Sequence, residues 1–455
     1  QDSVKGKPYG DGVLTSRSTF QKYYTQAELR LFIAEALNEE PLPVGPGIFY
    51  VFKDKDAEQR FMYGRLENKR NILQLARLSR PIRPDGTAIG VRPDKALAKY
   101  EAHKELLEDL WENCIALGRD PDRSEVPNVS EVSAAFGSLA AALRFIKSRK
   151  EDARKIMETA AQSRIDDIRV YFAQMQFDKR KRYSHLESRL QRDIKAFFGC
   201  YENAVADGKA ILYSLGNVDC IASACQTAAD HGIGWLEEGK SLQLHTSLVP
   251  QLPATLRAYI CCGTELYGDV SSADVVKIHI NTGKLSLMKY DDFLGKPLPR
   301  MIQRVKLNLR RQQFEVFDYE GEYTPPYLYR KSRFINEEVP MYAEQLAFEE
   351  SLDALTLFDF DRYGPAPDKF DTTMAAKRYE VAGFQLVRSS SIPALDEPCG
   401  EFLKFGDLIH CGETRARLGL SNIPKEPASY GALLDLAINV LDPIIDYFGM
   451  IRLTY

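Results

Sequence analysis

The stretch Val-Val-Lys-Ile-His-Ile-Asn-Thr-Gly-Lys-Leu-Ser-Leu-Met-Lys-Tyr, residues 275–290, decides the fold class. Two apolar runs, residues 275–280 and 285–290, flank Asn281-Thr282-Gly283, a tight-turn sequence, which predicts a β-hairpin. Before it, residues 219–228 have a helical pattern. A hairpin beside helices predicts an α+β chain, and 455 residues suit about three domains.

The hairpin carries the candidates for catalysis. Lys277 and His279 are two residues apart, so they share one face of the first strand. Asp291 and Asp292 follow the second strand. Lysine, histidine and carboxylates together can coordinate a metal or contact a phosphodiester, as in nucleases. The alternative is an exposed face of alternating polar residues, because no metal-ligand spacing is present, and no metal site is predicted.

Residues 101–146 predict three helices: one ending at a Gly118 turn, a short one after Pro121, and a third after the turn at 136–138. Gly-Arg-Asp-Pro at 118–121 and Phe-Gly-Ser at 136–138 resemble the homing-endonuclease-associated repeat, a small DNA-binding module. The third helix is predicted to start at a Ser138 cap and to continue through a set of cations that could contact phosphates, namely Lys147, Arg149, Lys150, Arg154 and Lys155. The alternative is a structural linker with a solvated basic face.

A second basic run precedes a helix that we expect over residues 185–205. It consists of Lys179, Arg180, Lys181 and Arg182. Four consecutive cations form either a solvated turn or a contact to nucleic-acid phosphates. Further along, residues 302–334 interleave cations with aromatics, which fits either a strand packed on a core with cation–π contacts or a surface that stacks bases.

Composition limits the classes of function. The net charge of −4 predicts no general attraction to nucleic acid, so any DNA surface must be a local patch. The eight cysteines include no Cys-x-x-Cys pair, and buried reduced thiols are typical of cytoplasmic proteins. We see no run of about 18 apolar residues and expect no membrane span.

The first segment, residues 7–52, predicts a helix opened by Thr25 and Glu28 as a capping box, then a strand at 48–52 buried on both faces. Its short sequence motifs resemble those of the last helix and strand of the methyltransferase domain in the DNA phosphorothioation-associated methyltransferase family. Similar blocks follow in the same order up to about residue 335, at 182–186, 193–199, 256–259, 276–279 and 290–293.

The resemblance implies a parent protein that is a class I, Rossmann-like, S-adenosylmethionine-dependent methyltransferase in DNA modification and phage defence. Its partners would be DNA and other DNA-modification proteins. The glycine-rich turn that holds S-adenosylmethionine is expected to precede this chain, which itself would supply DNA-binding and accessory regions. The alternatives are a non-enzymatic DNA-binding adaptor and a metal-dependent nuclease.

The last segment resembles the entry to zinc D-alanyl-D-alanine carboxypeptidase-like domains, on residues 402–424, a following helix and a strand at 451–454. A zinc site is expected only if the domain is completed after Tyr455, because His410 alone cannot hold a zinc ion. The predicted organisation is a methyltransferase tail (1–64), a connector (65–99), a helical helix-turn-helix-like module (100–165), a mixed α/β accessory domain (166–388) and a truncated peptidase-like α+β domain (389–455).

Overall fold

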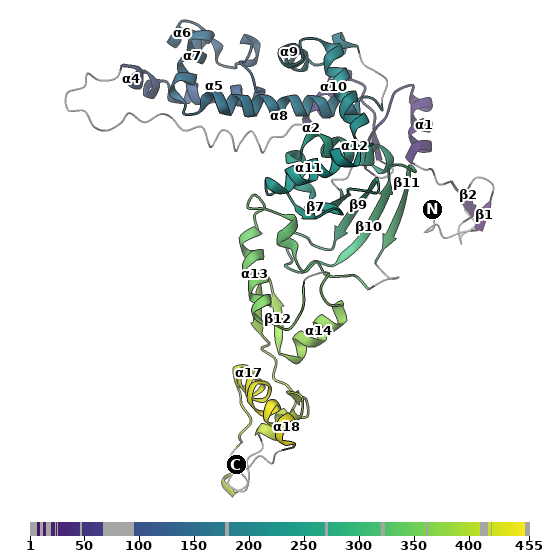
Figure 1. Ribbon diagram of the computed structural model, residues 1–455, viewed down its shortest axis with the longest axis vertical. Helices are drawn as coiled ribbons and strands as arrows, with labels where there is room; N and C mark the ends of the chain where they lie inside the picture. Colours follow the sequence, from purple (N-terminus) through teal and green to yellow (C-terminus); the bar gives the residue numbers. More distant parts are fainter. Residues whose placement is uncertain are drawn as a thin grey trace. The chain divides into compact units, whose positions relative to one another are not determined.

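The computed structural model describes residues 7–9, 12–14, 20–22, 24, 26–45, 48–66, 95–177, 182–268, 272–319, 324–360, 363–409, 417–419 and 421–450 (Figure 1). The chain divides into two compact units. Unit 1 comprises residues 1–288 and 304–317, and unit 2 comprises residues 289–303 and 318–455. The fold is mixed α+β with antiparallel strand pairs, as the hairpin pattern predicts.

The N-terminal elements of unit 1 are small. Strands β1 (Lys7–Tyr9), β2 (Gly12–Leu14) and β3 (Phe20–Gln21) form one sheet, and β4 (Leu42–Gly45) pairs antiparallel with β5 (Ile48–Tyr50). Helices α1 (Gln26–Leu37) and α2 (Lys55–Leu66) flank this second pair in sequence. The helix prediction is confirmed by α1. The prediction of a strand buried on both faces is wrong, since Ile48 and Tyr50 are 55% and 48% exposed. The pair is covered on one side only: Leu42 of β4 is buried in a core with helix residues, whereas β5 exposes Ile48 and Tyr50.

The predicted three-helix unit is confirmed. It contains α4 (Lys95–Ala102), α5 (Lys104–Leu117), the turn η1 (Arg123–Glu125), α6 (Val129–Phe136) and α7 (Leu139–Arg149), around a core that includes Trp111 and Ile146. Gly118 ends α5 with φ of +63°. The predicted continuation of the third helix through Arg154 is wrong, because Lys150 is extended and a new helix, α8 (Ala153–Gln174), starts three residues later.

Helix α8 also packs against a second set of helices. The turn η2 (Tyr183–His185) leads to α9 (Ser188–Phe197) and α10 (Tyr201–Ser214), where one helix over residues 185–205 was predicted. The break lies at Gly199, whose φ of +76° a right-handed helix does not allow. Helices α8 and α10 approach closely at Gly208, where a Cβ atom would lie 2.5 Å from the Cβ of Phe172.

A six-stranded sheet follows in sequence order: β6 (Trp235–Glu237), β7 (Ser241–His245), β8 (Val275–His279), β9 (Lys284–Tyr290), β10 (Met301–Asn308) and β11 (Gln313–Asp318). The predicted hairpin is β8–β9, with Val275 opposite Met288 and His279 opposite Lys284. Helices α11 (Val218–Asp230) and α12 (Ala254–Tyr267) cover one face, and η3 (Thr246–Gln251) precedes α12 (Figure 1). The core between them contains apolar residues of both helices and alternate residues of the strands.

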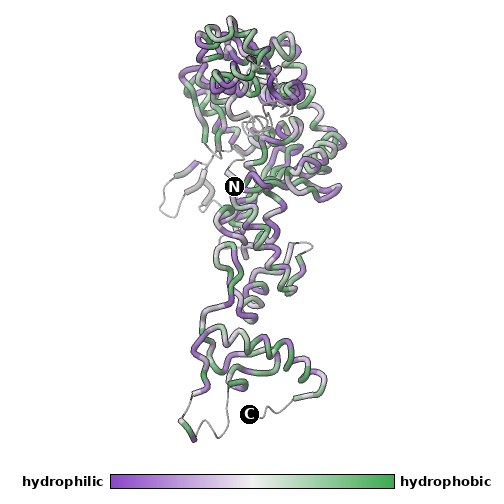
Figure 2. Tube along the Cα trace, turned by 90° about the vertical axis from the view of Figure 1, so that its left-hand side faces the viewer, coloured by the Kyte–Doolittle hydropathy of each residue, from purple (hydrophilic) through white to green (hydrophobic). Residues whose placement is uncertain are grey.

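Unit 2 has two separate cores. The first is formed by η5 (Lys331–Phe334), α13 (Tyr342–Ala354), α14 (Pro367–Ala376) and the hairpin β12 (Tyr379–Ala382) and β13 (Gln385–Arg388), with Phe348 and Phe370 buried. The second contains β14 (Pro398–Cys399), β15 (Leu403–Lys404), α15 (Phe405–Ile409), α17 (Pro427–Leu436), the π-helical segment η6 (Ala437–Leu441) and α18 (Asp442–Phe448). Hydrophobic and hydrophilic residues alternate along these helices (Figure 2), which is typical of amphipathic packing.

Within the described residues, one helical stretch, Pro427–Phe448, is long and apolar enough to cross a membrane, and the bent pair α6 and α7 passes the same test only if taken together. The stretch includes Asp435 and Asp442, and its Tyr430 and Leu434 are buried in the second core of unit 2. Of the apolar window in this stretch, 28% is buried. His410 and the expected strand at 451–454 lie outside the described residues.

Candidate nucleic-acid interface

The predicted pair Lys277 and His279 belongs to one face of the six-stranded sheet. In the register of β7, β8 and β9, Lys277 lies opposite Gln243 and Ser286, while His279 lies opposite Ser241 and Lys284. Residues directly opposite one another point to the same side of a sheet. Their neighbours Ile278 and Leu285 face the core with α11 and α12. We call the opposite surface the polar sheet face.

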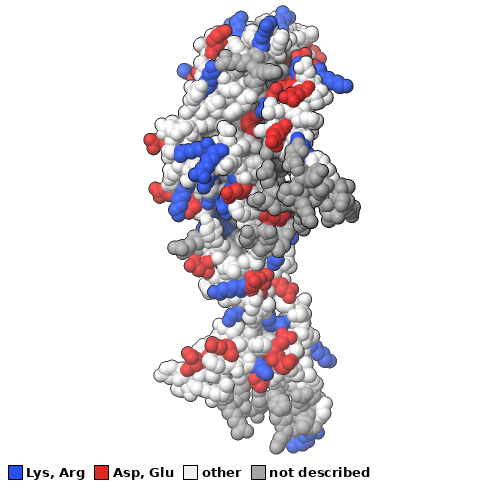
Figure 3. Space-filling view, turned by 90° about the vertical axis from the view of Figure 1, so that its right-hand side faces the viewer, with Lys and Arg blue, Asp and Glu red and all other residues white. Residues whose placement is uncertain are grey.

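Strand β10 adds two further cations to the polar sheet face. Val305 and Leu307 are buried in the core, so the alternating residues Arg304 and Lys306 point to the other side. The polar residues of the polar sheet face are therefore Glu237, Ser241, Gln243, Lys277, His279, Lys284, Ser286, Arg304 and Lys306. Of these, Ser241, Gln243, Lys277 and Ser286 are buried. Figure 3 shows Lys and Arg side chains gathered at the level of the sheet strands of Figure 1.

The electrostatics of this face centre on His279. Burial, together with the positive charges of Lys277, Arg304, Lys284 and Lys306, lowers the pKa of His279 to about 4. Its Nε2 lies 3.1 Å from Ser286 Oγ. At neutral pH the imidazole is therefore uncharged, because a proton there would be repelled by four cations. A site with this field attracts anions.

The cations of the polar sheet face differ in their partners. Lys277 is nearly buried and lies 3.6 Å from the Glu237 carboxylate. Among the described residues, Lys284, Arg304 and Lys306 form no ion pair, and the buried Nε of Arg304 has no hydrogen-bond partner. Lys306 Nζ lies 4.4 Å from the centre of the Phe317 ring. Cations without an acidic partner, one of them over an aromatic ring, are an arrangement that suits a phosphate backbone and its bases.

The predicted carboxylates have local partners instead. Asp291 Oδ1 accepts from the backbone N–H groups of Asp292 and Arg300, both at 2.9 Å, and its Oδ2 accepts from Lys296 Nζ at 2.6 Å. Asp292 Oδ1 accepts from the Gly295 N–H at 2.8 Å. These bonds close the turn after β9. In the described part of the chain, no group of three or more His, Cys, Asp or Glu side chains is placed to hold a metal ion.

The cations of the helical module, which the sequence predicted to bind DNA, mostly have intramolecular partners. Lys147 pairs with Asp120, and Lys150, whose side chain is 1% exposed, pairs with Glu108. The remaining contacts are Arg154 Nε to Glu158 at 2.8 Å, and Arg149 at 5.9 Å from the Phe145 ring centre.

Ser138 has the predicted local role, because its Oγ accepts from the Ala141 N–H at 3.2 Å and so caps α7. Arg182 is exposed at the start of η2. Lys179, Arg180 and Lys181 lie outside the described residues, so their predicted contact with DNA stays a prediction.

Arg119 of the Gly-Arg-Asp-Pro turn belongs to a buried ionic network. Its guanidinium donates to Glu125 at 2.8 and 2.9 Å and to Asp193 Oδ1 at 2.7 Å. Asp193 Oδ2 accepts from Arg164 at 3.0 Å, and Asp193 is fully buried. This network joins the three-helix unit to α8 and α9, so Arg119 has a structural role here.

Sequence reasoning placed Arg304 and Lys306 in a basic and aromatic stretch but did not connect them, or Lys284, with His279. The alternation of Arg304 and Lys306 with Val305 and Leu307 is the signal that could have assigned them to one sheet face. No family model matches the chain, and comparisons with curated proteins and with solved structures found no match.

Proposed function

We propose that this chain binds nucleic acid, with the polar sheet face as the contact to the phosphate backbone. The observation that carries the proposal is a contrast between two basic regions. The described cations of the helical module mostly bond to neighbouring side chains, whereas Lys284, Arg304 and Lys306 have no ion pair among the described residues and surround a neutral histidine. A cation that has no acidic partner among the described residues is available to a phosphate, and Lys306 would keep or exchange its contact with the Phe317 ring.

DNA is the polymer that the family resemblance favours. On that resemblance we further propose that the chain is part of a methyltransferase of DNA modification, and the methyltransferase activity, S-adenosylmethionine and the partner proteins all stay predictions. Of the alternatives, the non-enzymatic adaptor needs only the polar sheet face. The nuclease needs carboxylates at the same place, and Asp291 and Asp292 are instead bonded within their own turn.

The test compares two pairs of substitutions in the complete chain, with binding to labelled DNA measured by fluorescence anisotropy. Arg304→Gln with Lys306→Gln removes charge from the polar sheet face, and Lys147→Gln with Arg154→Gln removes the same charge from the helical module. We expect the first pair to weaken binding at least about tenfold and the second to leave it within about twofold, because each phosphate contact contributes separately.

The opposite result would assign DNA binding to the helical module and overturn the assignment to the sheet. Absence of DNA binding by the unmodified chain at low salt would overturn the proposal as a whole.

A further inference from the structure

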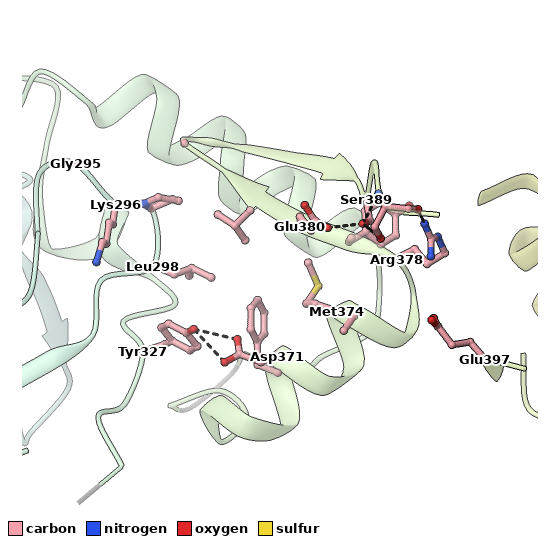
Figure 4. Close-up of a pocket in the computed structure, with 17 residues that line it drawn as sticks. Gly295, Lys296, Leu298, Tyr327, Asp371, Met374, Arg378, Glu380, Ser389 and Glu397 are labelled. Atoms are coloured by element: carbon pink, nitrogen blue, oxygen red, sulfur yellow. Dashed lines mark hydrogen bonds between the residues drawn. The ribbon is translucent and has the colours of Figure 1, made fainter. Parts of the chain in front are cut away.

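Unit 2 contains a cavity of about 780 Å3 that the polar sheet face does not share. It is lined by the 295–298 turn, Tyr327, helix α14 and the β12–β13 hairpin, with Glu397 at its edge (Figure 4). This volume lies within the range of small-molecule sites. The cavity is therefore large enough for a ligand of metabolite size.

The middle of the cavity is apolar. Leu298, Phe370, Met374 and Val381 contribute to its lining, and Leu298 and Met374 lie between the two polar ends in Figure 4. Phe370 and Met374 belong to the first core of unit 2, which holds them in place from behind. Such a surface binds an apolar group by removing it from water.

At one end of the cavity the charges are already neutralised. The Tyr327 hydroxyl donates to Asp371 at 3.0 Å, and Arg300 donates to the same carboxylate at 3.1 Å. Arg300 also lies 4.6 Å from the centre of the Tyr327 ring, and Lys296 Nζ lies 2.6 Å from Asp291. This end offers hydroxyl and ring surface but no charge without a partner of opposite sign.

The other end carries Arg378, Glu380 and Glu397. Arg378 is only 8% exposed, donates to the Ser391 carbonyl and lies 5.8 Å from the Phe405 ring centre. Ser389 donates to Glu380, and the Ala394 N–H donates to Glu397 at 2.8 Å. Among the described residues, none of the three groups forms an ion pair within 4.0 Å. Arg378 is buried, whereas Glu380 and Glu397 are exposed, so this end presents a cation held in place and two carboxylates open to solvent. A ligand that carries both signs could pair with the guanidinium and with a carboxylate.

We infer that this cavity binds a zwitterionic amino acid with an apolar side chain. Its carboxylate would accept from Arg378, its ammonium group would donate to Glu397, and its side chain would lie on Phe370 and Met374. A phosphate ester fits less well, since it would bring two negative charges to an end that already has two carboxylates and one arginine. This inference is independent of nucleic-acid binding.

The experiment titrates the complete chain with L-phenylalanine and with L-leucine by isothermal calorimetry. Two analogues each remove one charge: N-acetyl-L-phenylalanine lacks the ammonium group, and L-phenylalanine amide lacks the carboxylate. We expect saturable binding of at least one amino acid, and binding at least about tenfold weaker for each analogue, which corresponds to about 1.4 kcal/mol.

Substitutions locate the site. Arg378→Gln should abolish the preference for L-phenylalanine over its amide. Glu397→Gln should weaken the binding of L-phenylalanine but not the binding of its N-acetyl analogue. Lys369→Gln, an exposed residue of α14 outside the lining, is the matched control and should leave binding unchanged. Because Arg378 is buried, thermal unfolding checks that its variant folds, and the Glu397 variant tests the site if it does not.

No saturable binding of either amino acid at millimolar concentration would overturn the inference. Equal binding of L-phenylalanine and both analogues would also overturn it. So would unchanged binding in both single variants, a folded Arg378→Gln and Glu397→Gln.

Discussion

Asp193 shows how a single buried residue can hold two parts of unit 1 together. Its two carboxylate oxygens accept from Arg119 and Arg164, which come from the turn after α5 and from α8. A buried carboxylate is stable only while its partners remain, because removal of one partner leaves the other charge in a poorly solvated site. The network therefore specifies how the helices pack.

Substitution of Asp193 should be costly for this reason. Asp193→Ala leaves Arg119 and Arg164 without their shared acceptor, and we expect the free energy of unfolding to fall by about 3–5 kcal/mol. Urea unfolding followed by circular dichroism measures the change. Glu158→Ala removes an ion pair that is exposed to water, and it should have no measurable effect. Equal effects of both substitutions would contradict this role of Asp193.

His279 gives a pH dependence whose sign follows from its pKa. The folded pKa is about 4 and the ordinary value is 6.5. Between these values the unfolded chain binds a proton at His279 that the folded chain does not, so stability falls as pH decreases from about 6.5 to about 4. His279→Gln should reduce this fall, as measured by thermal unfolding at several pH values. The same pH profile in the variant would show that other groups cause it.

At the scale of elements, the helices of unit 1 depend on close approaches that only glycine permits. At Gly208 in α10, a Cβ atom would lie 2.5 Å from the Phe172 side chain and 2.7 to 2.8 Å from the backbone of α8. At Gly64 in α2, no heavy atom lies within 4 Å of the same position. Both glycines are inside helices, so they differ in packing rather than in local conformation.

The two glycines should therefore respond to alanine with opposite signs. Gly208→Ala forces α8 and α10 apart and should lower the free energy of unfolding by about 1–3 kcal/mol. Gly64→Ala should leave stability unchanged or raise it by about 0.5–1 kcal/mol, because alanine is the better helix former. Urea unfolding of both variants is the measurement. Loss of stability in the Gly64 variant alone would be incompatible with this packing.

At the scale of the whole molecule, the net charge of −4 opposes binding to DNA at long range, so the polar sheet face must act locally. Salt screens such contacts, and each phosphate neutralised adds about −0.9 to the slope of log affinity against log salt concentration. Lys284, Arg304 and Lys306, which have no ion pair in the described part of the chain, thus predict a slope near −2.7 for duplex DNA.

The prediction is tested by repeating the DNA titration between about 50 and about 200 mM salt. Lys284→Gln should make the slope less negative by about 0.9, because one counterion fewer is released. Lys155→Gln, at an exposed position of α8, is the matched control and should leave the slope unchanged. A slope near zero in the unmodified chain would show that phosphate contacts do not drive the binding.

The sequence by itself determined features that depend on neighbouring residues. The β8–β9 hairpin follows from Asn281-Thr282-Gly283 between apolar runs, the end of α5 from Gly118, and the start of α7 from the Ser138 cap. Turns and caps are made by backbone and side chains a few residues apart, so their chemistry is readable locally. The helix predicted over 185–205 failed because the left-handed conformation of Gly199 was not foreseen.

Only the tertiary structure decided which charges have partners. Lys150 and Glu108 are 42 residues apart, and Arg119 and Asp193 are 74 apart, yet each pair is in contact. The same packing places Arg304 and Lys306 of β10 near His279 of β8, and neither cation has an ion pair with a described residue. Burial and ion pairing depend on distances between remote segments, so a run of basic residues cannot reveal whether its charges are already neutralised.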